Sequence, residues 1–123
     1  MGERILFVED EFQSRSVFCD WVRTEGYKVT EARDGAEAVE LLETERFDLV
    51  ISDLVLPKLH GLNLVDWIRS KWPQMPLVVI SGYLAEDAGK IILEGYAEFI
   101  QKPIKPEILL ATVQRLLSIV KSN

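Results

Sequence analysis

Five short apolar stretches recur along the chain, separated by segments in which apolar residues return every three or four positions. These stretches cover residues 5–8, 28–32, 47–52, 77–81 and 99–100. Several of them are almost continuously apolar, which is typical of strands that are covered on both faces in a parallel sheet. The alternation of strand and helix patterns therefore predicts an α/β sandwich with right-handed crossovers.

The segments between the strands carry apolar side chains at helical spacing. We expect the core-facing residues to be Val17, Phe18, Trp21 and Val22 in a first helix, Ala36, Val39, Leu41 and Leu42 in a second, Leu64, Val65 and Ile68 in a third, and Leu109, Val113, Leu116, Leu117 and Val120 in a fifth. A fourth helix is expected near residues 84–94, where Gly89 costs about 1 kcal/mol relative to alanine. This helix has the weakest pattern, which suits a movable element.

Length and composition narrow the classes of function. A chain of 123 residues predicts one domain over residues 1–123, and we expect no output domain in it. The net charge of −6 disfavours contact with nucleic-acid phosphates and anionic lipid. Cys19 is the only cysteine, which excludes an internal disulfide, and its apolar neighbours favour helix packing over redox chemistry. No apolar run approaches the roughly 18 residues of a membrane span. We expect a cytoplasmic protein without nucleic-acid or membrane partners.

Polar side chains stand at the carboxyl ends of four of the predicted strands. They are Glu9, Asp10 and Glu11 after the first strand, Asp53 after the third, Ser81 at the end of the fourth, and Lys102 after the fifth. In an open parallel sheet these ends share one edge, where ligands bind. Carboxylates gathered there repel one another and need a cation or protons. Hard carboxylate oxygens favour Mg²⁺, which also accepts a phosphate oxygen, so the predicted edge indicates phosphoryl chemistry.

Each of these residues has an ordinary explanation when it is taken alone. Glu9, Asp10 and Glu11 are compatible with a solvated loop that favours the start of the next helix. Asp53 is compatible with a turn, and Lys102 with a surface loop. Their coincidence at the strand ends of one predicted sheet is what favours a shared site.

As a set, these residues resemble the receiver domain of two-component response regulators. The resemblance rests on residues 5–11 (ILFVEDE), residues 53–57 (DLVLP) with Gly61, the Ser81-Gly82 pair and residues 99–103 (FIQKP). It covers essentially the whole chain. It implies a flavodoxin-like, doubly wound domain with a five-stranded parallel sheet in the order 2-1-3-4-5 and five helices. That strand order comes from the resemblance and not from the strand pattern.

The resemblance also implies a phosphoacceptor and a metal site. Asp53 would take a phosphoryl group from a sensor histidine kinase or a histidine phosphotransfer protein. Asp10, Asp53 and the backbone carbonyl of Val55 would bind Mg²⁺ (or Mn²⁺), with Glu9 acting through a metal-bound water. Glu9 stands where Asp is commoner in the family, one methylene group longer.

Further residues would transmit the signal. Lys102 would pair with Asp53 or with the phosphoryl oxygens, and the bond from Lys102 to Pro103 would be cis. Ser81, where Thr is commoner, would hydrogen-bond to the phosphoryl group. Phe99, where Tyr is frequent, would then move inward by ring packing. Phosphorylation would shift the face made by the fourth helix, the fifth strand and the fifth helix between two arrangements.

The resemblance implies a signalling domain rather than an enzyme, with only self-phosphorylation and self-dephosphorylation. We expect the latter to be slow, because Val55 and Tyr83 carry no charged or amide group to orient water. Two alternatives are a receiver-like interaction domain that acts without phosphorylation and a magnesium-dependent phosphohydrolase. The second usually has another acid two residues after the nucleophile, where Val55 stands here. A flavin site is disfavoured, because no loop rich in hydroxyls and glycine follows the first strand.

Overall fold

The computed structural model describes residues 2–53, 61–82 and 97–121. The strands are β1 (Arg4–Val8), β2 (Lys28–Ala32), β3 (Leu49–Asp53), β4 (Leu77–Ser81) and β5 (Ala97–Gln101). The helices are α1 (Phe12–Arg23), α2 (Gly35–Thr44), α3 (Gly61–Lys71) and α5 (Pro106–Lys121). The fourth helix that we expect near residues 84–94 lies outside the described residues.

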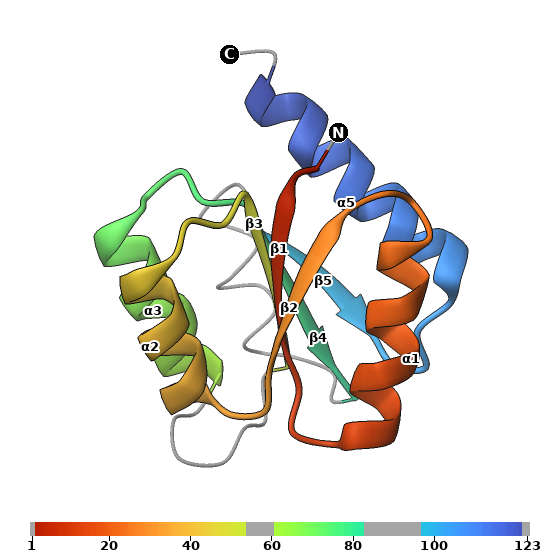
Figure 1. Cartoon of the computed structure of the whole chain (residues 1–123), viewed down its shortest axis with the longest axis horizontal. Helices are drawn as coiled ribbons and strands as arrows, with labels where there is room; N and C mark the ends of the chain where they lie inside the picture. Colours follow the sequence, from red (N-terminus) through yellow and green to blue (C-terminus); the bar gives the residue numbers. More distant parts are fainter. Residues whose placement is uncertain (1, 54–60, 83–96, 122–123) are drawn as a thin grey trace.

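The strands form one parallel sheet in the order β2-β1-β3-β4-β5. This confirms the flavodoxin-like arrangement that the resemblance implies. Helices α1 and α5 cover one face of the sheet, and α2 and α3 cover the other (Figure 1). The carboxyl ends of all five strands therefore lie at one edge, at the end of the molecule where α1 and α2 begin.

Strand β1 shows why the apolar runs are continuous. Leu6 and Val8 pack in the core between the sheet and α2 and α3, whereas Ile5 and Phe7 pack in the core beside α1 and α5. Successive side chains of a strand point to opposite faces, so a strand that is covered on both sides needs an apolar residue at every position.

Two helix positions correct the sequence prediction. Val17 is 47% exposed, because the buried stripe of α1 runs through Cys19 and Val22. Ala36 is exposed as well, and Ala38 takes the buried place on α2. In both cases the predicted residue precedes the buried one by two positions. Two positions correspond to about 200° around a helix, which turns the side chain away from the sheet.

Strands β1, β3 and β5 differ from their predicted limits by one or two residues, whereas β2 and β4 have the predicted limits. Phe47 is buried but precedes β3, which begins at Leu49. The apolar pattern therefore placed the start of this strand two residues early. At its other end β3 includes Asp53, so this residue is part of the strand and follows its geometry.

Side-chain caps define where α1 and α2 begin. Glu11 accepts a hydrogen bond from the Ser14 backbone N–H at 3.2 Å at the start of α1. Asp34 accepts one from the Glu37 N–H at 2.8 Å at the start of α2. Both caps follow a strand and thereby fix the turn at the carboxyl edge of the sheet.

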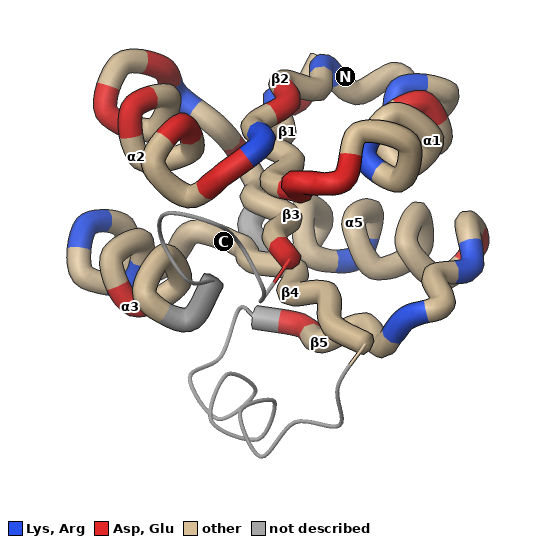
Figure 2. The backbone as a smooth tube through the Cα atoms, turned by 90° about the horizontal axis from the view of Figure 1, so that it is seen from below, with Lys and Arg blue, Asp and Glu red and all other residues tan. Residues whose placement is uncertain are grey.

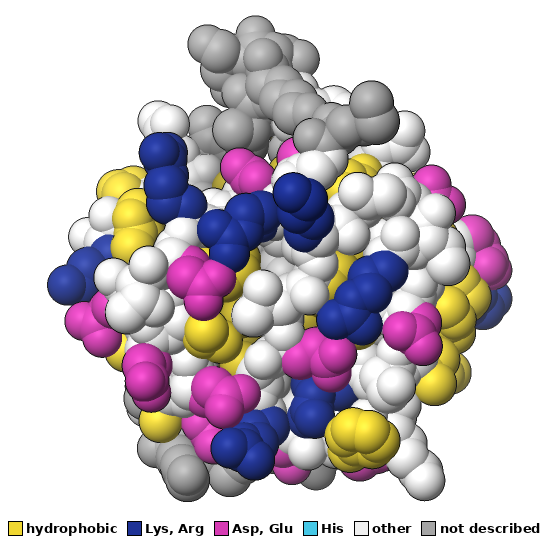
Figure 3. All heavy atoms as spheres, in the orientation of Figure 1, with side chains coloured by type: hydrophobic (Ala, Val, Ile, Leu, Met, Phe, Trp, Pro, Cys, Tyr) yellow, Lys and Arg dark blue, Asp and Glu magenta, His cyan; other side chains and the backbone are white. Residues whose placement is uncertain are grey.

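Charged side chains of both signs are interspersed on the face that Figure 3 presents.

Among the described residues, no helix combines the length and apolar character needed to cross a bilayer.

Candidate functional site

Three carboxylates meet at the carboxyl edge of the sheet. One oxygen each of Glu9, Asp10 and Asp53 lies within 4.8 Å of the other two. Figure 2 views the molecule towards this edge and shows the acidic segment between β1 and α1 close to the acidic end of β3. The structure thus brings together residues that are more than forty positions apart in the sequence.

The sheet register explains this proximity. Strands β1 and β3 are parallel neighbours in which Val8 lies opposite Ser52. Glu9 and Asp53 are the residues that follow this pair, so they lie side by side at the carboxyl edge of the sheet. The Glu9 N–H also donates a hydrogen bond to the Ala32 carbonyl at 3.0 Å, which holds this segment against the end of β2.

The three carboxylates differ in burial. Glu9 is 3% exposed and Asp53 is 6% exposed, whereas Asp10 is exposed. Burial, and then the neighbouring Asp53 carboxyl group, raise the pKa of Glu9 from 4.5 to about 8. One oxygen of Glu9, Oε2, is buried without a hydrogen-bond partner in the described part of the protein. Such a buried acceptor marks a place for a cation, a proton or water.

Lys102 brings a positive charge to this edge. Its Nζ lies 2.7 Å from Oδ2 of Asp53 and 3.6 Å from Oε1 of Glu9. Partial burial opposes the ammonium charge, but the hydrogen bond and the attraction of the two carboxylates outweigh it and raise the pKa of Lys102. Lys102 directly follows β5, where its N–H donates to the Ser81 carbonyl at 2.8 Å. The bond from Lys102 to Pro103 is cis.

Ser81 and Phe99 lie on neighbouring strands. Ser81 is the last residue of β4 and is 1% exposed, and Phe99 is half-buried in β5. Phe99 lies opposite Val79, two residues before Ser81. Since side chains alternate along a strand, Ser81 and Phe99 project from the same face of the sheet. Phe99 packs against the core beneath α2 and α3.

Two of the predicted site residues fall in parts of the chain that the structure does not describe. Val55, whose carbonyl the resemblance assigns to the metal, and Tyr83 both lie outside the described residues.

The described residues fit a hard divalent cation. The donor set consists of carboxylate oxygens, which Mg²⁺ prefers, and it includes the unpartnered Oε2 of Glu9. One oxygen of each acid lies within 4.8 Å of one oxygen of the other two, so the three acids are close enough to share one cation, directly or through a bound water.

Sequence reasoning missed Arg15, although this residue contacts the acidic segment. Its Nη1 donates a hydrogen bond to the Glu9 carbonyl at 2.8 Å, and its Nε lies 3.0 Å from Oε1 of Glu31. The only signal in the sequence is an arginine one helical turn after an acidic cluster. That signal does not show which backbone oxygen the side chain reaches.

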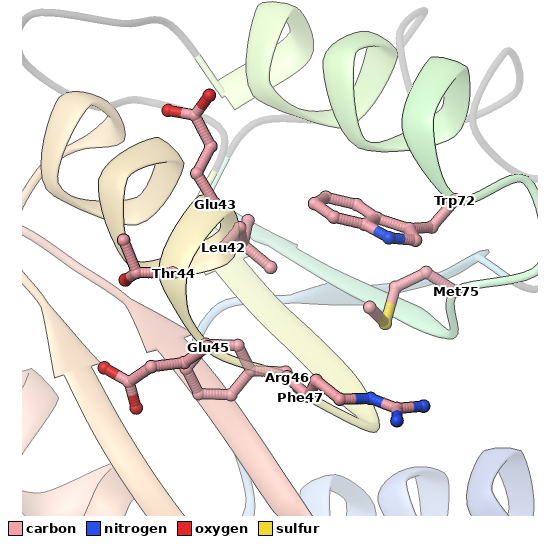
Figure 4. A pocket seen from close by; sticks show the side chains of 8 residues that line it. All are labelled: Leu42, Glu43, Thr44, Glu45, Arg46, Phe47, Trp72 and Met75. Atoms are coloured by element: carbon pink, nitrogen blue, oxygen red, sulfur yellow. The ribbon is translucent and has the colours of Figure 1, made fainter.

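A separate hollow of about 360 Å³ lies at the opposite edge of the sheet, between the end of α2, the start of β3 and the segment after α3 (Figure 4). The side chains of Leu42, Phe47, Trp72 and Met75 contribute to its lining. In Figure 4, the carboxylates of nearby Glu43 and Glu45 point away from Trp72 and Met75. This hollow lacks the gathered acids of the carboxyl edge, so the candidate functional site is the acidic edge.

Comparison with known proteins gives a match over most of the chain. The family model described as the response regulator receiver domain matches residues 5–114. The chain is 37% identical over 106 residues to the Regulator of RpoS of Escherichia coli strain K12, covering 85% of the chain and 32% of that protein. It is 36% identical over 117 residues to the sensor kinase CckA of Brucella abortus, covering 92% of the chain and 12% of that protein. The chain thus spans about a third or less of these curated relatives.

Solved structures show the same architecture. The signal receiver domain of a signal transduction histidine kinase from Syntrophus aciditrophicus matches with a TM-score of 0.89 and 31% identity. This match covers 99% of the chain and 95% of the solved one.

Proposed function

This chain belongs to the response regulator receiver domain family of two-component systems, and we propose that it carries a phosphoryl group on Asp53. Members of this family are signalling domains that bind Mg²⁺ through acidic residues. The observation that carries the proposal is the position of the Lys102 ammonium, which contacts both Asp53 and Glu9. An oxygen of Asp10 lies within 4.8 Å of one oxygen of each of these two acids.

We infer that the donor is a phosphohistidine on a cytoplasmic sensor kinase or a histidine phosphotransfer protein. The similarity to a sensor kinase and to the receiver domain of a histidine kinase supports such a partner. The transfer is a displacement at phosphorus. A carboxylate oxygen of Asp53 forms a P–O bond, the P–N bond of the phosphohistidine breaks, and its electron pair stays with the imidazole.

Lys102 acts electrostatically in this proposal. The Asp53 carboxylate and an incoming phosphoryl group carry the same sign of charge, so the ammonium beside Asp53 lowers the cost of bringing them together. Lys102 already contacts Asp53, so its positive charge is in place before the donor arrives. Bound Mg²⁺, held by Asp10 and Asp53 with Glu9 nearby and the carbonyl of Val55 completing the set, would neutralise charge on the phosphoryl oxygens.

The proposed response involves β4 and β5. The Ser81 hydroxyl would hydrogen-bond to the phosphoryl group, and Phe99, which projects from the same face, would repack. These shifts would favour one of two arrangements of the face that includes β5 and α5. We propose slow self-dephosphorylation as the only hydrolytic activity, with no turnover of a separate substrate.

The test uses a small acyl phosphate, acetyl phosphate, as the donor. We expect the intact protein to gain the mass of one phosphoryl group in Mg²⁺, and to gain none in a chelator or in the Asp53→Asn variant. Asp48→Asn is the matched control, because Asp48 lies just before the opposite end of the same strand and accepts a hydrogen bond from the Arg4 N–H. Absence of the gain in the unchanged protein, or multiple turnover of acetyl phosphate without a phosphorylated protein, would contradict the proposal.

A further inference from the structure

Arg15 links the acidic segment to the neighbouring helix and strand. Its Nη1 donates to the Glu9 carbonyl at 2.8 Å, and its Nε pairs with Oε1 of Glu31 at 3.0 Å. The side chain is only 12% exposed although it comes from the first turn of α1. A largely buried guanidinium with two acceptors on different elements is held in one orientation.

We propose that Arg15 is a positioning residue for the metal site. By fixing the Glu9 carbonyl, it sets the direction of the peptide unit between Glu9 and Asp10 and thereby directs both carboxylates toward Asp53. This inference rests on the proposed function, because it assigns Arg15 a part in Mg²⁺ binding. Arg15 acts through the backbone of Glu9 and is not itself a ligand.

Asp10 depends on such positioning because no described residue holds its side chain by a hydrogen bond or an ion pair. Within the described residues its carboxylate makes no hydrogen bond or ion pair with a protein group, and it is exposed. Its two chain neighbours are fixed instead. Glu9 is held through its N–H by Ala32 and through its carbonyl by Arg15, and Glu11 caps α1. The place of the Asp10 carboxylate therefore follows from the backbone on either side of it.

Other side chains hold the Arg15 guanidinium in turn. Oε2 of Glu31 accepts a hydrogen bond from Nη2 of Arg23 at 3.1 Å. The same Arg23 nitrogen donates to the Val29 carbonyl at 3.1 Å. The guanidinium carbon of Arg15 lies 5.5 Å from the centre of the Phe12 ring. These contacts tie Arg15 to β2 and α1, the elements that flank the acidic segment.

Positioning and simple charge predict opposite effects on Mg²⁺ binding. If Arg15 contributed only its positive charge, removing it would reduce repulsion of the divalent ion and tighten binding. If Arg15 positions the Glu9 carbonyl, removing it lets the acidic segment relax and weakens binding. Loss of a group that orients a metal ligand typically costs about 10–100-fold in affinity.

The experiment is a calorimetric titration of the full chain with Mg²⁺ alone. Arg15→Met removes both hydrogen bonds but keeps an apolar stem over Phe12, and Arg15→Lys keeps the charge without the forked geometry. Arg4→Met is the matched control: Arg4 also pairs with a glutamate, Glu45, and its guanidinium carbon lies 5.2 Å from an aromatic ring centre. Arg4 stands at the start of β1, at the opposite edge of the sheet.

We expect Arg15→Met to raise the dissociation constant for Mg²⁺ about tenfold, Arg15→Lys to raise it by a smaller factor, and Arg4→Met to leave it unchanged. In phosphorylation by acetyl phosphate, the Mg²⁺ concentration for half-maximal rate should rise by the same factor, with the rate at saturating Mg²⁺ retained. A general structural defect would not produce this separation.

Equal or tighter Mg²⁺ binding by folded Arg15→Met would overturn the inference and leave the proposed function standing. Failure of the unchanged protein to bind Mg²⁺ would overturn both. Far-UV circular dichroism in a chelator reports whether each variant is folded. If Arg15→Met does not fold, Arg15→Lys decides: weaker binding than the unchanged protein supports the inference, and equal binding overturns it.

Discussion

The Nζ of Lys102 lies 2.7 Å from Oδ2 of Asp53, although the two residues are 49 positions apart in the sequence. Lys102 follows β5, Asp53 ends β3, and β4 lies between these strands in the sheet. The lysine side chain therefore spans the end of β4 to reach the aspartate. The same ammonium lies 3.6 Å from Oε1 of Glu9, so one cation contacts two buried acids.

Replacing Lys102 with methionine should destabilise the protein in the absence of divalent ions, because the buried Asp53 carboxylate loses the cation that lies 2.7 Å from it. Loss of one partner of a fully buried pair costs roughly 3–5 kcal/mol. Since the Lys102 side chain is 36% exposed, we expect a loss of about 1–2 kcal/mol in the free energy of unfolding at neutral pH. Urea unfolding in a chelator measures this loss, and added Mg²⁺ should reduce it.

Lys105→Met is the control for this variant, because Lys105 is exposed and makes no side-chain ion pair with the described residues. Its expected effect is below about 0.5 kcal/mol. Equal losses in the two variants would contradict the role of Lys102 as a counter-ion.

Stability without metal should decrease as the pH rises. The pKa of Glu9 is about 8 in the folded protein, against an ordinary value of 4.5. Between these values the folded state holds a proton that the unfolded chain has released. The stabilisation is therefore complete below about pH 4.5 and is lost as the pH rises through about 8. Urea unfolding in a chelator across this range measures the decline.

Glu9→Gln cannot titrate at this position and should flatten the pH profile. Mg²⁺ should flatten the profile of the unchanged protein as well, since the ion replaces the proton at the carboxylates. A Glu9→Gln profile as steep as that of the unchanged protein would show that another group is responsible.

The thiol of Cys19 should be unreactive in the folded protein. Burial raises its pKa to about 12, and the side chain is fully inaccessible. The thiolate is the reactive species, so modification by a disulfide reagent at mildly alkaline pH should be orders of magnitude slower than in concentrated denaturant. Val17→Cys in a Cys19→Ala background is the control, because position 17 is 47% exposed on the same helix. Similar rates at the two positions would refute the burial of Cys19.

Removing the cap of α2 should cost stability. Asp34 accepts a hydrogen bond from the Glu37 N–H at 2.8 Å, and Asp34→Ala leaves that donor without its partner. We expect a loss of about 1 kcal/mol in the free energy of unfolding, and a smaller loss for Asp34→Asn, which can still accept the bond. An unchanged midpoint in urea for Asp34→Ala would contradict the capping role.

Local sequence patterns were sufficient to predict where the strands lie and that their carboxyl ends share one edge of the sheet. Residues 77–81 (LVVIS) form a strand with the predicted limits, because a continuous apolar run between helices leaves few alternatives. Residues 28–32 (KVTEA) also form a strand with the predicted limits, although their apolar pattern is weaker. The approach of Asp53 to Glu9 followed from the rule that parallel strands end at one edge. The order of the strands did not follow from the pattern, since pairing between β1 and β3 depends on contacts that no local segment encodes. It came from the family resemblance.

The placement of side chains was harder to predict from the sequence. Val17 and Ala36 fit an apolar stripe, but the docking angle of each helix selects Cys19 and Ala38 instead. The contact of Arg15 with the Glu9 carbonyl joins a long flexible side chain to a backbone atom, and residue type alone does not predict it. The raised pKa of Glu9 likewise requires its burial and its distance from Asp53 to be known.

The most direct test of the central claim is to locate the phosphoryl group after reaction with acetyl phosphate and Mg²⁺. Borohydride reduces the acyl phosphate to a stable alcohol, and tryptic cleavage after Arg46 and Lys58 isolates residues 47–58 for sequencing by mass spectrometry. We expect the modification at Asp53 alone. Modification at Glu9, Asp10 or Asp48, or a phosphoryl gain that persists in Asp53→Asn, would contradict the account.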